Sequence, residues 1–303
     1  MTHSRAVGLM VLVTLMWSIA GVVTRHLDSA RSFEVTFWRS LFNALALIVA
    51  LSVMRGPALW RTITRGGWPL WATGLCWAVK YTNFMVAITL TTVATVLVTM
   101  SVAPLVTALF ARVFLKHRLP LRTWVAIGIA GIGIAWMFGR QALEGGSSLT
   151  GILVALGVPL AGATNWTLLQ YIHQRHARDP SIEAPDMLPA VLIGALLSAA
   201  VTLPVAWPLS ATAHDLGLLG LLGVVQLAIP CLIAVRLAKV LPAPEISLLA
   251  LLEVIFGVLL AWVGAGEAPG STALAGGALV IGALLANEAL GLHSRRRSAA
   301  AAA

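Results

Sequence analysis

Long apolar runs separated by short polar connections form the main pattern of this chain. Ten such runs can be read, each near the ~20 residues that a helix needs to cross a bilayer. We expect membrane spans at residues 6–24, 34–54, 68–89, 92–114, 122–139, 150–172, 187–207, 216–238, 244–263 and 271–291. The longest polar connection, His173–Asp186, is short, so we expect no separate soluble domain.

One arrangement occurs twice: an apolar helix, a short connection and a Gly-rich apolar helix. The first copy comprises Val93–Phe114, Lys116–Pro120 and Trp124–Phe138, and the second Ile246–Val263, Gly264–Gly270 and Leu274–Ala286. Few residues are identical, so the likeness lies in hydropathy and in the placing of the breaks. It predicts two five-helix repeats, residues 1–145 and 146–303.

The composition fits this pattern. Hydrophobic residues make up 59% of the chain, charged residues only 10%, and the mean hydropathy is +0.93. Soluble domains carry roughly 25% charged residues, so the fold class predicted is an all-α integral membrane protein of ten transmembrane helices around a central cavity. We attribute the net charge of +9 to basic residues at helix ends and expect the lipid bilayer, and no nucleic acid, as partner.

The basic residues also predict the orientation. With the N-terminus in the cytoplasm, 15 of the 20 Lys and Arg residues fall on inside segments and three on outside segments. The positive-inside rule therefore predicts that both termini are cytoplasmic. An odd number of spans per repeat inverts the second repeat relative to the first, an arrangement that suits alternating access. The basic start and small-residue trio of the first span are also typical of a signal peptide, but we expect this span to be retained.

Two charges lie near the middle of predicted spans, Lys80 in the third and Glu253 in the ninth. Charges at this depth cost about 2.5–3.5 kcal/mol by insertion scales, so each needs an explanation. They could form a structural ion pair, or they could face a wet cavity and meet a charged solute or a proton. Arg39 lies nearer the end of its span, and we interpret it as structural.

Further polar and aromatic residues lie at similar depth in spans of both repeats. The predicted substrate-binding residues are Trp17, Asn43, Trp77, Lys80, Tyr81, Thr99, Asn165, Trp166 and Gln226. Any one Trp could serve packing alone, but aromatic walls with amides and one ammonium suit a zwitterion with an apolar side chain. Pro104 and Pro230, like Pro159, interrupt predicted spans, as static kinks or as hinges.

Motifs for enzymatic chemistry are missing. No phosphate-binding glycine loop is present, and His173-x-x-His176 lies in a charged connection, where a solvated loop explains it better than a metal. Cys76 and Cys231 each lie in an apolar run and are interpreted as core residues. We therefore expect no catalytic residue, metal or cofactor. Small residues four apart in the fifth and tenth spans predict close helix packing, within a monomer or between the protomers of a homodimer.

The chain resembles the drug/metabolite transporter superfamily, and specifically its EamA-type branch. The matching segments are Leu15–Ser18, Phe37–Arg39, Ala87–Ile88, Val102–Pro104, Gln226, Leu251–Glu253 and Gly266–Glu267. Within the branch it is most similar to YddG-type exporters of aromatic amino acids. The resemblance implies an exporter in the cell inner membrane, with a central cavity lined by both halves.

Three functions are compatible with the sequence. The first is a secondary transporter or facilitator that exports amino acids, aromatic and other apolar ones, by alternating access. The second is a proton-coupled exporter of other metabolites or drugs, with Glu253 as the proton carrier. The third, of another class, is a membrane scaffold or sensor that transports nothing.

Overall fold

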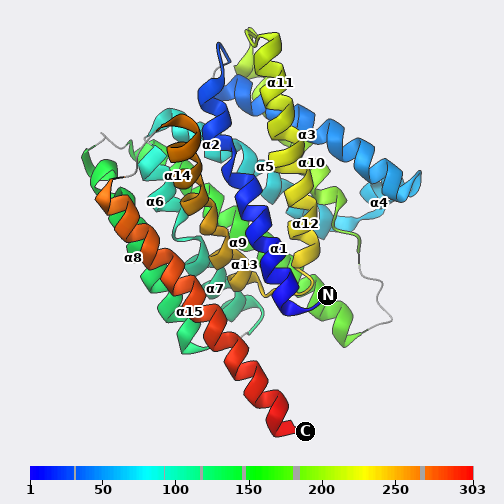
Figure 1. The fold of residues 1–303 in the computed structure, drawn as a ribbon. Coiled ribbons are helices and arrows are strands. Elements are labelled where there is room, and N and C mark those ends of the chain that lie inside the picture. The colour runs from blue at the N-terminus through cyan, green and yellow to red at the C-terminus, as the bar shows by residue number, and fades with distance from the viewer. Residues whose placement is uncertain are drawn as a thin grey trace.

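The computed structural model describes residues 1–30, 32–91, 93–116, 119–144, 148–179, 185–266 and 270–302, which contain helices and no strand (Figure 1). The first half comprises α1 (His3–Ser18), α2 (Ala20–Val23), η1 (Thr24–His26), α3 (Ser32–Arg55), α4 (Ala58–Arg65), α5 (Gly67–Leu90), α6 (Val93–Met100), α7 (Ala103–Phe114) and α8 (Leu121–Glu144). The second half comprises α9 (Leu149–Arg178), α10 (Pro189–Ala206), α11 (Ala213–Leu221), η2 (Leu222–Ala228), α12 (Ile229–Leu237), α13 (Ala243–Ala250), α14 (Leu252–Ala265) and α15 (Ser271–Ala302). The predicted connections Lys116–Pro120 and Gly264–Gly270 include residues 117, 118 and 267–269, which lie outside the described part.

Eight helices of the described chain are long and apolar enough to cross a membrane. They are His3–His26, Phe33–Arg55, Thr95–Phe114, Leu121–Gly139, Leu149–Arg178, Pro189–Ala206, Ala213–Leu237 and Ala243–Gly264. Each coincides with a predicted span. The other two predicted spans fall on α5, which has 24 residues, and on α15, whose apolar part is the shorter helix Ser271–Asn287. The all-helical membrane protein is thus confirmed, whereas the count of ten spans stays a prediction.

The fourth and ninth predicted spans are each divided into two helices. An interruption of the fourth span was expected from Pro104, whereas the ninth span was expected to be a single helix, and that expectation is wrong. Between α6 and α7 the helix is interrupted just before Pro104, which has no backbone N–H to donate. Between α13 and α14 there is no proline. There the N–H of Leu251 bonds to the carbonyl of Leu248, three residues back, at 3.2 Å. Such breaks leave backbone groups free inside the protein, where transporters use them to bind solutes.

The eighth predicted span contains a π-helical segment, η2, directly before Pro230. A proline at this position cannot donate to the carbonyl four residues earlier, so the preceding turn widens. Segments of this kind occur often at functional sites. By contrast, α9 runs through Pro159 without ending, so the predicted interruption of the sixth span is not observed.

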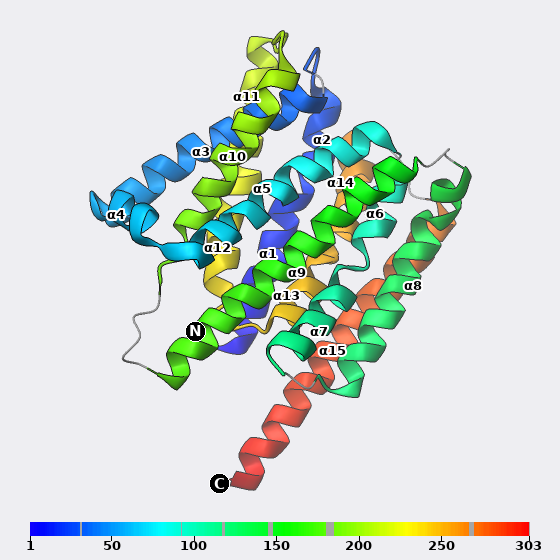
Figure 2. The ribbon, with the colours of Figure 1, turned by 180° about the vertical axis from the view of Figure 1, so that it is seen from behind.

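The fifth and tenth predicted spans pack against each other as α8 and α15, as expected from their small residues (Figure 2). The small residues four apart include Gly131 in the fifth span and Gly282 in the tenth, but the glycines at the contact are Gly133 and Gly276. A Cβ on Gly133 would lie 2.7 Å from the carbonyl oxygen of Gly276, whereas one on Gly131 or Gly282 would meet nothing within 4 Å. The four-residue spacing of small residues thus predicted which two helices pack together. It mostly did not predict the helix face that forms the contact, because α8 carries more than one row of small residues.

The remaining helices pack in pairs that join the two halves of the chain. α10 packs against both α3 and α5, α5 also packs against α9, and α1 packs against α12 and α14. Figures 1 and 2 show both termini toward the same end of the molecule, with α11 at the other end. A single large core between these helices contains Met10, Leu47, Trp77 and Leu192, each almost fully buried.

Two carboxylates join the halves at the α11 end. Asp215 is fully buried and accepts hydrogen bonds from the backbone N–H groups of Asp28 (2.7 Å), Ser29 (3.1 Å), Ala30 (3.1 Å) and Thr212 (3.2 Å). Glu34 likewise accepts from the N–H groups of Ser210 and Ala211, both at 2.7 Å. Carboxylates that accept several N–H bonds hold a chain firmly. Both residues lie in the first turn of a helix, Glu34 in α3 and Asp215 in α11, and neither was predicted from the sequence.

Candidate functional site

The site forms around Lys80, which lies in the middle of α5 and is only half-buried. Three tryptophans from three helices surround its ammonium. They are Trp17 at the end of α1, Trp77 one turn before Lys80 on α5, and Trp166 on α9. Because α1 and α5 belong to the first half of the chain and α9 to the second, both halves contribute to the site.

The ammonium of Lys80 lies against the faces of these rings. Its Nζ is 4.1 Å from the ring centroid of Trp77, 5.0 Å from that of Trp166 and 5.7 Å from that of Trp17. All three distances are within the ~6 Å over which an aromatic face attracts a cation. The Trp side chains are 7% (Trp17), 1% (Trp77) and 4% (Trp166) exposed, so water weakens the attraction little. We call Lys80 and these three residues the tryptophan cage.

The cage is supported by direct ring contacts. Trp77 and Trp166 pack edge to face, with their centroids 5.7 Å apart, and Trp77 also contacts Tyr81, at 5.6 Å. The hydroxyl of Tyr81 donates to the sulfur of Cys231 at 3.4 Å. Both cysteines are free and buried. Cys231 therefore adds a contact to the site that the sequence did not indicate, since one small residue in an apolar run carries no distinguishing pattern.

Two predicted residues stabilise the backbone around the cage. The side-chain nitrogen of Gln226, on the π-helical segment η2, donates to the backbone carbonyl of Trp17 at 3.2 Å. A guanidinium nitrogen of Arg39 donates to the backbone carbonyl of Tyr81 at 3.3 Å. The first bond explains how a residue of the second half positions a Trp of the first half. The second fits the structural interpretation of Arg39.

Asn43 and Asn165 are fully buried, and neither side-chain amide forms a hydrogen bond of standard geometry with the described residues. Buried polar groups are nearly always hydrogen-bonded. Such groups beside a binding site therefore suit a solute or water as the missing partner. Asn165 directly precedes the cage residue Trp166 in α9, and Asn43 interacts with Tyr81, whose ring packs on Trp77.

Glu253 lies in the first turn of α14, directly after the break in the ninth predicted span, and is half-buried. It interacts electrostatically with both Lys80 and Arg39. Among the described residues, however, no ion pair within 4.0 Å joins it to either one. The structural ion pair between Lys80 and Glu253 that the sequence allowed is therefore not formed in this conformation.

The remaining predicted residues lie apart from the cage contacts. The hydroxyl of Thr99 donates to the carbonyl of Thr95 within its own helix, at 2.7 Å. Pro104 lies in the first turn of α7 and Pro230 in the first turn of α12, so each follows a change in helix geometry.

One group of side chains in the described part of the chain has the spacing of metal ligands. Asp28, His214 and Asp215 have side-chain ligand atoms within 4.8 Å of one another. Both oxygens of Asp215 already accept N–H bonds, so this group is explained as a connection between loops. His173 and His176, expected in a loop, lie instead near the end of helix α9. A ring nitrogen of His173 lies 3.2 Å from the carbonyl oxygen of Ala238.

Comparison with known proteins agrees with this architecture. Residues 4–139 match the EamA-like transporter family. No curated protein matches the sequence. This structure aligns with the crystal structure of a protein that is 18% identical in sequence, with a TM-score of 0.75. The alignment covers 97% of this chain and 99% of the other, so the two share their fold over nearly the whole length. Residues 4–139 are therefore similar to the EamA-like transporter family, and the apolar helices and the shared fold are those of a multi-pass membrane protein.

Proposed function

We propose that this protein is a secondary transporter of the cell inner membrane that exports amino acids, aromatic and other apolar ones, by alternating access. The observation that carries the proposal is the tryptophan cage. A Lys ammonium surrounded by rings at 4.1–5.7 Å, without an acidic partner within 4.0 Å in the described chain, leaves a positive charge free for a solute carboxylate. The rings offer apolar surface for the solute side chain.

The packing supports an arrangement of two inverted five-helix repeats, residues 1–145 and 146–303. α1 packs against α12 as α9 packs against α5, which pairs the first span of each half with the third span of the other. α3 packs against α10, and α8 against α15, which pairs equivalent spans. The breaks in the fourth and ninth spans are also equivalent. Repeats of this kind can alternate between two access states around a shared central site.

The experiment is counterflow of labelled Phe and Trp through purified protein in liposomes. We expect Trp17→Ala and Trp166→Ala each to slow the exchange, whereas Trp60→Ala removes a 54%-exposed ring from α4 and should leave it unchanged. Lys80→Met should slow exchange of Phe but not of its methyl ester, which has no carboxylate. Equal rates for all variants, verified as folded by size-exclusion chromatography, would refute the proposal. Exchange of no amino acid or cationic drug would favour the scaffold or sensor.

Proton coupling is a second candidate, favoured by one observation. The carboxyl of Glu253 interacts electrostatically with Lys80 and Arg39 without forming an ion pair within 4.0 Å with either in the described chain. A carboxyl in that position could exchange a proton as the site changes access. The proton-coupled exporter of other metabolites or drugs therefore differs from the first proposal in the role of Glu253 and in the solute.

A further inference from the structure

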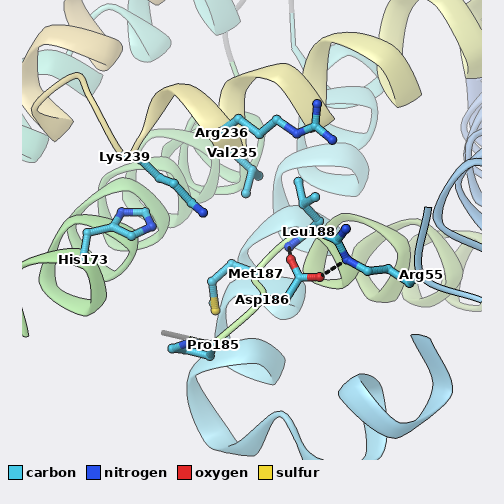
Figure 3. A pocket seen from close by; sticks show the side chains of 9 residues that line it. All are labelled: Arg55, His173, Pro185, Asp186, Met187, Leu188, Val235, Arg236 and Lys239. Carbon is cyan, nitrogen blue, oxygen red and sulfur yellow. Dashed lines mark hydrogen bonds and ion pairs between the residues drawn. The ribbon is translucent and has the colours of Figure 1, made fainter. Parts of the chain in front are cut away.

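A pocket at another place in the molecule has a different chemistry. It has a volume of about 310 Å³ and lies where the ends of α3, α9 and α12 meet the start of α10 (Figure 3). Its lining residues are Arg55, His173, Pro185, Asp186, Met187, Leu188, Val235, Arg236 and Lys239. None of them belongs to the tryptophan cage.

The pocket is strongly cationic. Its described lining holds three basic side chains, from Arg55, Arg236 and Lys239, against one acidic side chain, Asp186. Both oxygens of Asp186 are occupied: Oδ2 accepts from Nε of Arg55 at 2.7 Å, and Oδ1 from the N–H of Leu188 at 3.2 Å. The acid therefore neutralises one cation, and two positive charges remain.

These two charges have no acidic partner among the described residues. Among the described residues, the Arg236 side chain donates to the sulfur of Met54 at 3.8 Å, and the Lys239 side chain forms no hydrogen bond or ion pair. Figure 3 shows the Lys239 side chain extending into the space between His173 and Asp186. Cations that line one concave site without counter-charge are typical of sites for anions.

The position of the pocket indicates which class of anion could bind there. The turn that carries Lys239 leads directly into α13, where Glu245 pairs with His3 of the N-terminal helix. The pocket therefore lies at the end that holds the N-terminus, where the basic residues gather and where the membrane surface meets the cytoplasm. Basic pockets between membrane helices on this side suit phosphate groups of lipid heads.

We infer that this pocket is a binding site for a phosphate-bearing anion, held by Lys239 and Arg236 together with the Arg55–Asp186 pair. Arg55 belongs to the first half of the chain and the other basic residues to the second. An anion bound here would therefore join the two halves at the end opposite the Asp215 connection. The phosphate could belong to an anionic lipid or to a soluble molecule, and the experiment separates these sources.

The test is titration of the purified full-length protein in neutral detergent. The probes are a short-chain phosphatidylglycerol, the matching phosphatidylcholine and inorganic phosphate, and binding is measured calorimetrically. The variant Arg236→Gln/Lys239→Gln changes two exposed side chains, so folding should survive. The matched control, Arg61→Gln/Arg65→Gln, removes two exposed charges from α4, outside the pocket.

We expect phosphatidylglycerol or inorganic phosphate, but not phosphatidylcholine, to bind the unmodified protein. Binding should weaken about tenfold in the pocket variant, as loss of a hydrogen bond to a charged group predicts, and far less in the control. Binding of the lipid alone identifies a lipid head group as the source, and binding of inorganic phosphate identifies a soluble one. Absence of binding by both probes, or equal weakening in both variants, would overturn the inference. As an independent measure, raising the salt concentration must weaken binding to the unmodified protein.

Discussion

The tryptophan cage predicts a measurable coupling between Lys80 and each of its rings. Cation–π attraction amounts to about 0.5–1 kcal/mol at exposed sites and ~2 kcal/mol where water is excluded. The Trp77 ring is the nearest, at 4.1 Å, and is 1% exposed. We therefore expect a coupling of about 1–2 kcal/mol between Lys80 and Trp77. Coupling should be smaller for Trp166 and smallest for Trp17, in the order of their distances.

Single substitutions cannot show this coupling. Replacing a buried Trp by a smaller residue costs about 3–5 kcal/mol through lost packing alone, which hides the smaller electrostatic contribution. A double-mutant cycle removes the packing contribution because it occurs on both sides of the cycle. The substitutions are Lys80→Met, which keeps the length of the side chain, and Trp77→Leu. Trp77→Phe would serve as a milder alternative that keeps a ring of weaker cation affinity.

The assay follows the helical circular dichroism of the purified protein in mixed micelles as the fraction of a denaturing detergent is raised. The free energy of unfolding of the two single variants, the double variant and the unmodified protein gives the coupling. The same cycle with Trp60→Leu, on α4, serves as the control and should give no coupling. The reasoning fails if the Lys80–Trp77 coupling is below about 0.3 kcal/mol, the usual error of additivity, or if Trp17 couples more strongly than Trp77.

Three further predictions concern other parts of the molecule. Gly133→Leu should separate α8 from α15 and lower the unfolding free energy by about 1–3 kcal/mol, as overpacking does, whereas Gly131→Leu, which enters open space, should change it little. Asp215→Asn replaces a charged acceptor of several N–H bonds and should cost about 1–3 kcal/mol in the same unfolding assay, whereas exposed Asp28→Asn should cost less. If protons are coupled through Glu253, Glu253→Gln should abolish the pH dependence of transport in liposomes.

Each of these has a contrary result. Equal loss of stability in the two glycine variants would mean that the contact between α8 and α15 is not as close as the carbonyl position indicates. An Asp215 variant as stable as the Asp28 variant would show that the N–H bonds add little. If transport by the unmodified protein does not depend on pH, and Glu253→Gln transports at the same rate, the proton-coupled mechanism is excluded.

Much of the fold could be predicted because hydropathy alone specifies where a helix can cross lipid. Eight predicted spans coincide with membrane-length helices in the described chain. Pro104 indicated the break at Ser101–Val102, but the break at Leu251 could not be predicted, because its sequence does not differ from that of an intact apolar helix. Pro159 shows the converse: a proline in the sixth predicted span leaves α9 continuous, since neighbouring helices can hold a helix that has lost one bond.

The site was predicted in part for a similar reason. Residues that are costly in lipid, such as Lys80 and three deep tryptophans, stand out in the sequence, and the structure brings these four together. Thr99 is not part of the cage, because its hydroxyl donates a hydrogen bond to a backbone carbonyl of its own helix. Asp215 and the cationic pocket were not anticipated. Their partners lie far apart in the chain, and only folding shows which loop charges are neutralised.

The position of Lys80 inside the ring system has a consequence for selectivity. A tethered ammonium competes with any free amine for the same aromatic faces at an effective concentration of about millimolar or higher. Simple amines and cationic drugs would have to displace it, whereas a molecule that also bears a carboxylate gains from leaving it in place. In the proposed transporter the lysine would therefore compete with plain cations for the rings and orient a zwitterion with its carboxylate toward the ammonium.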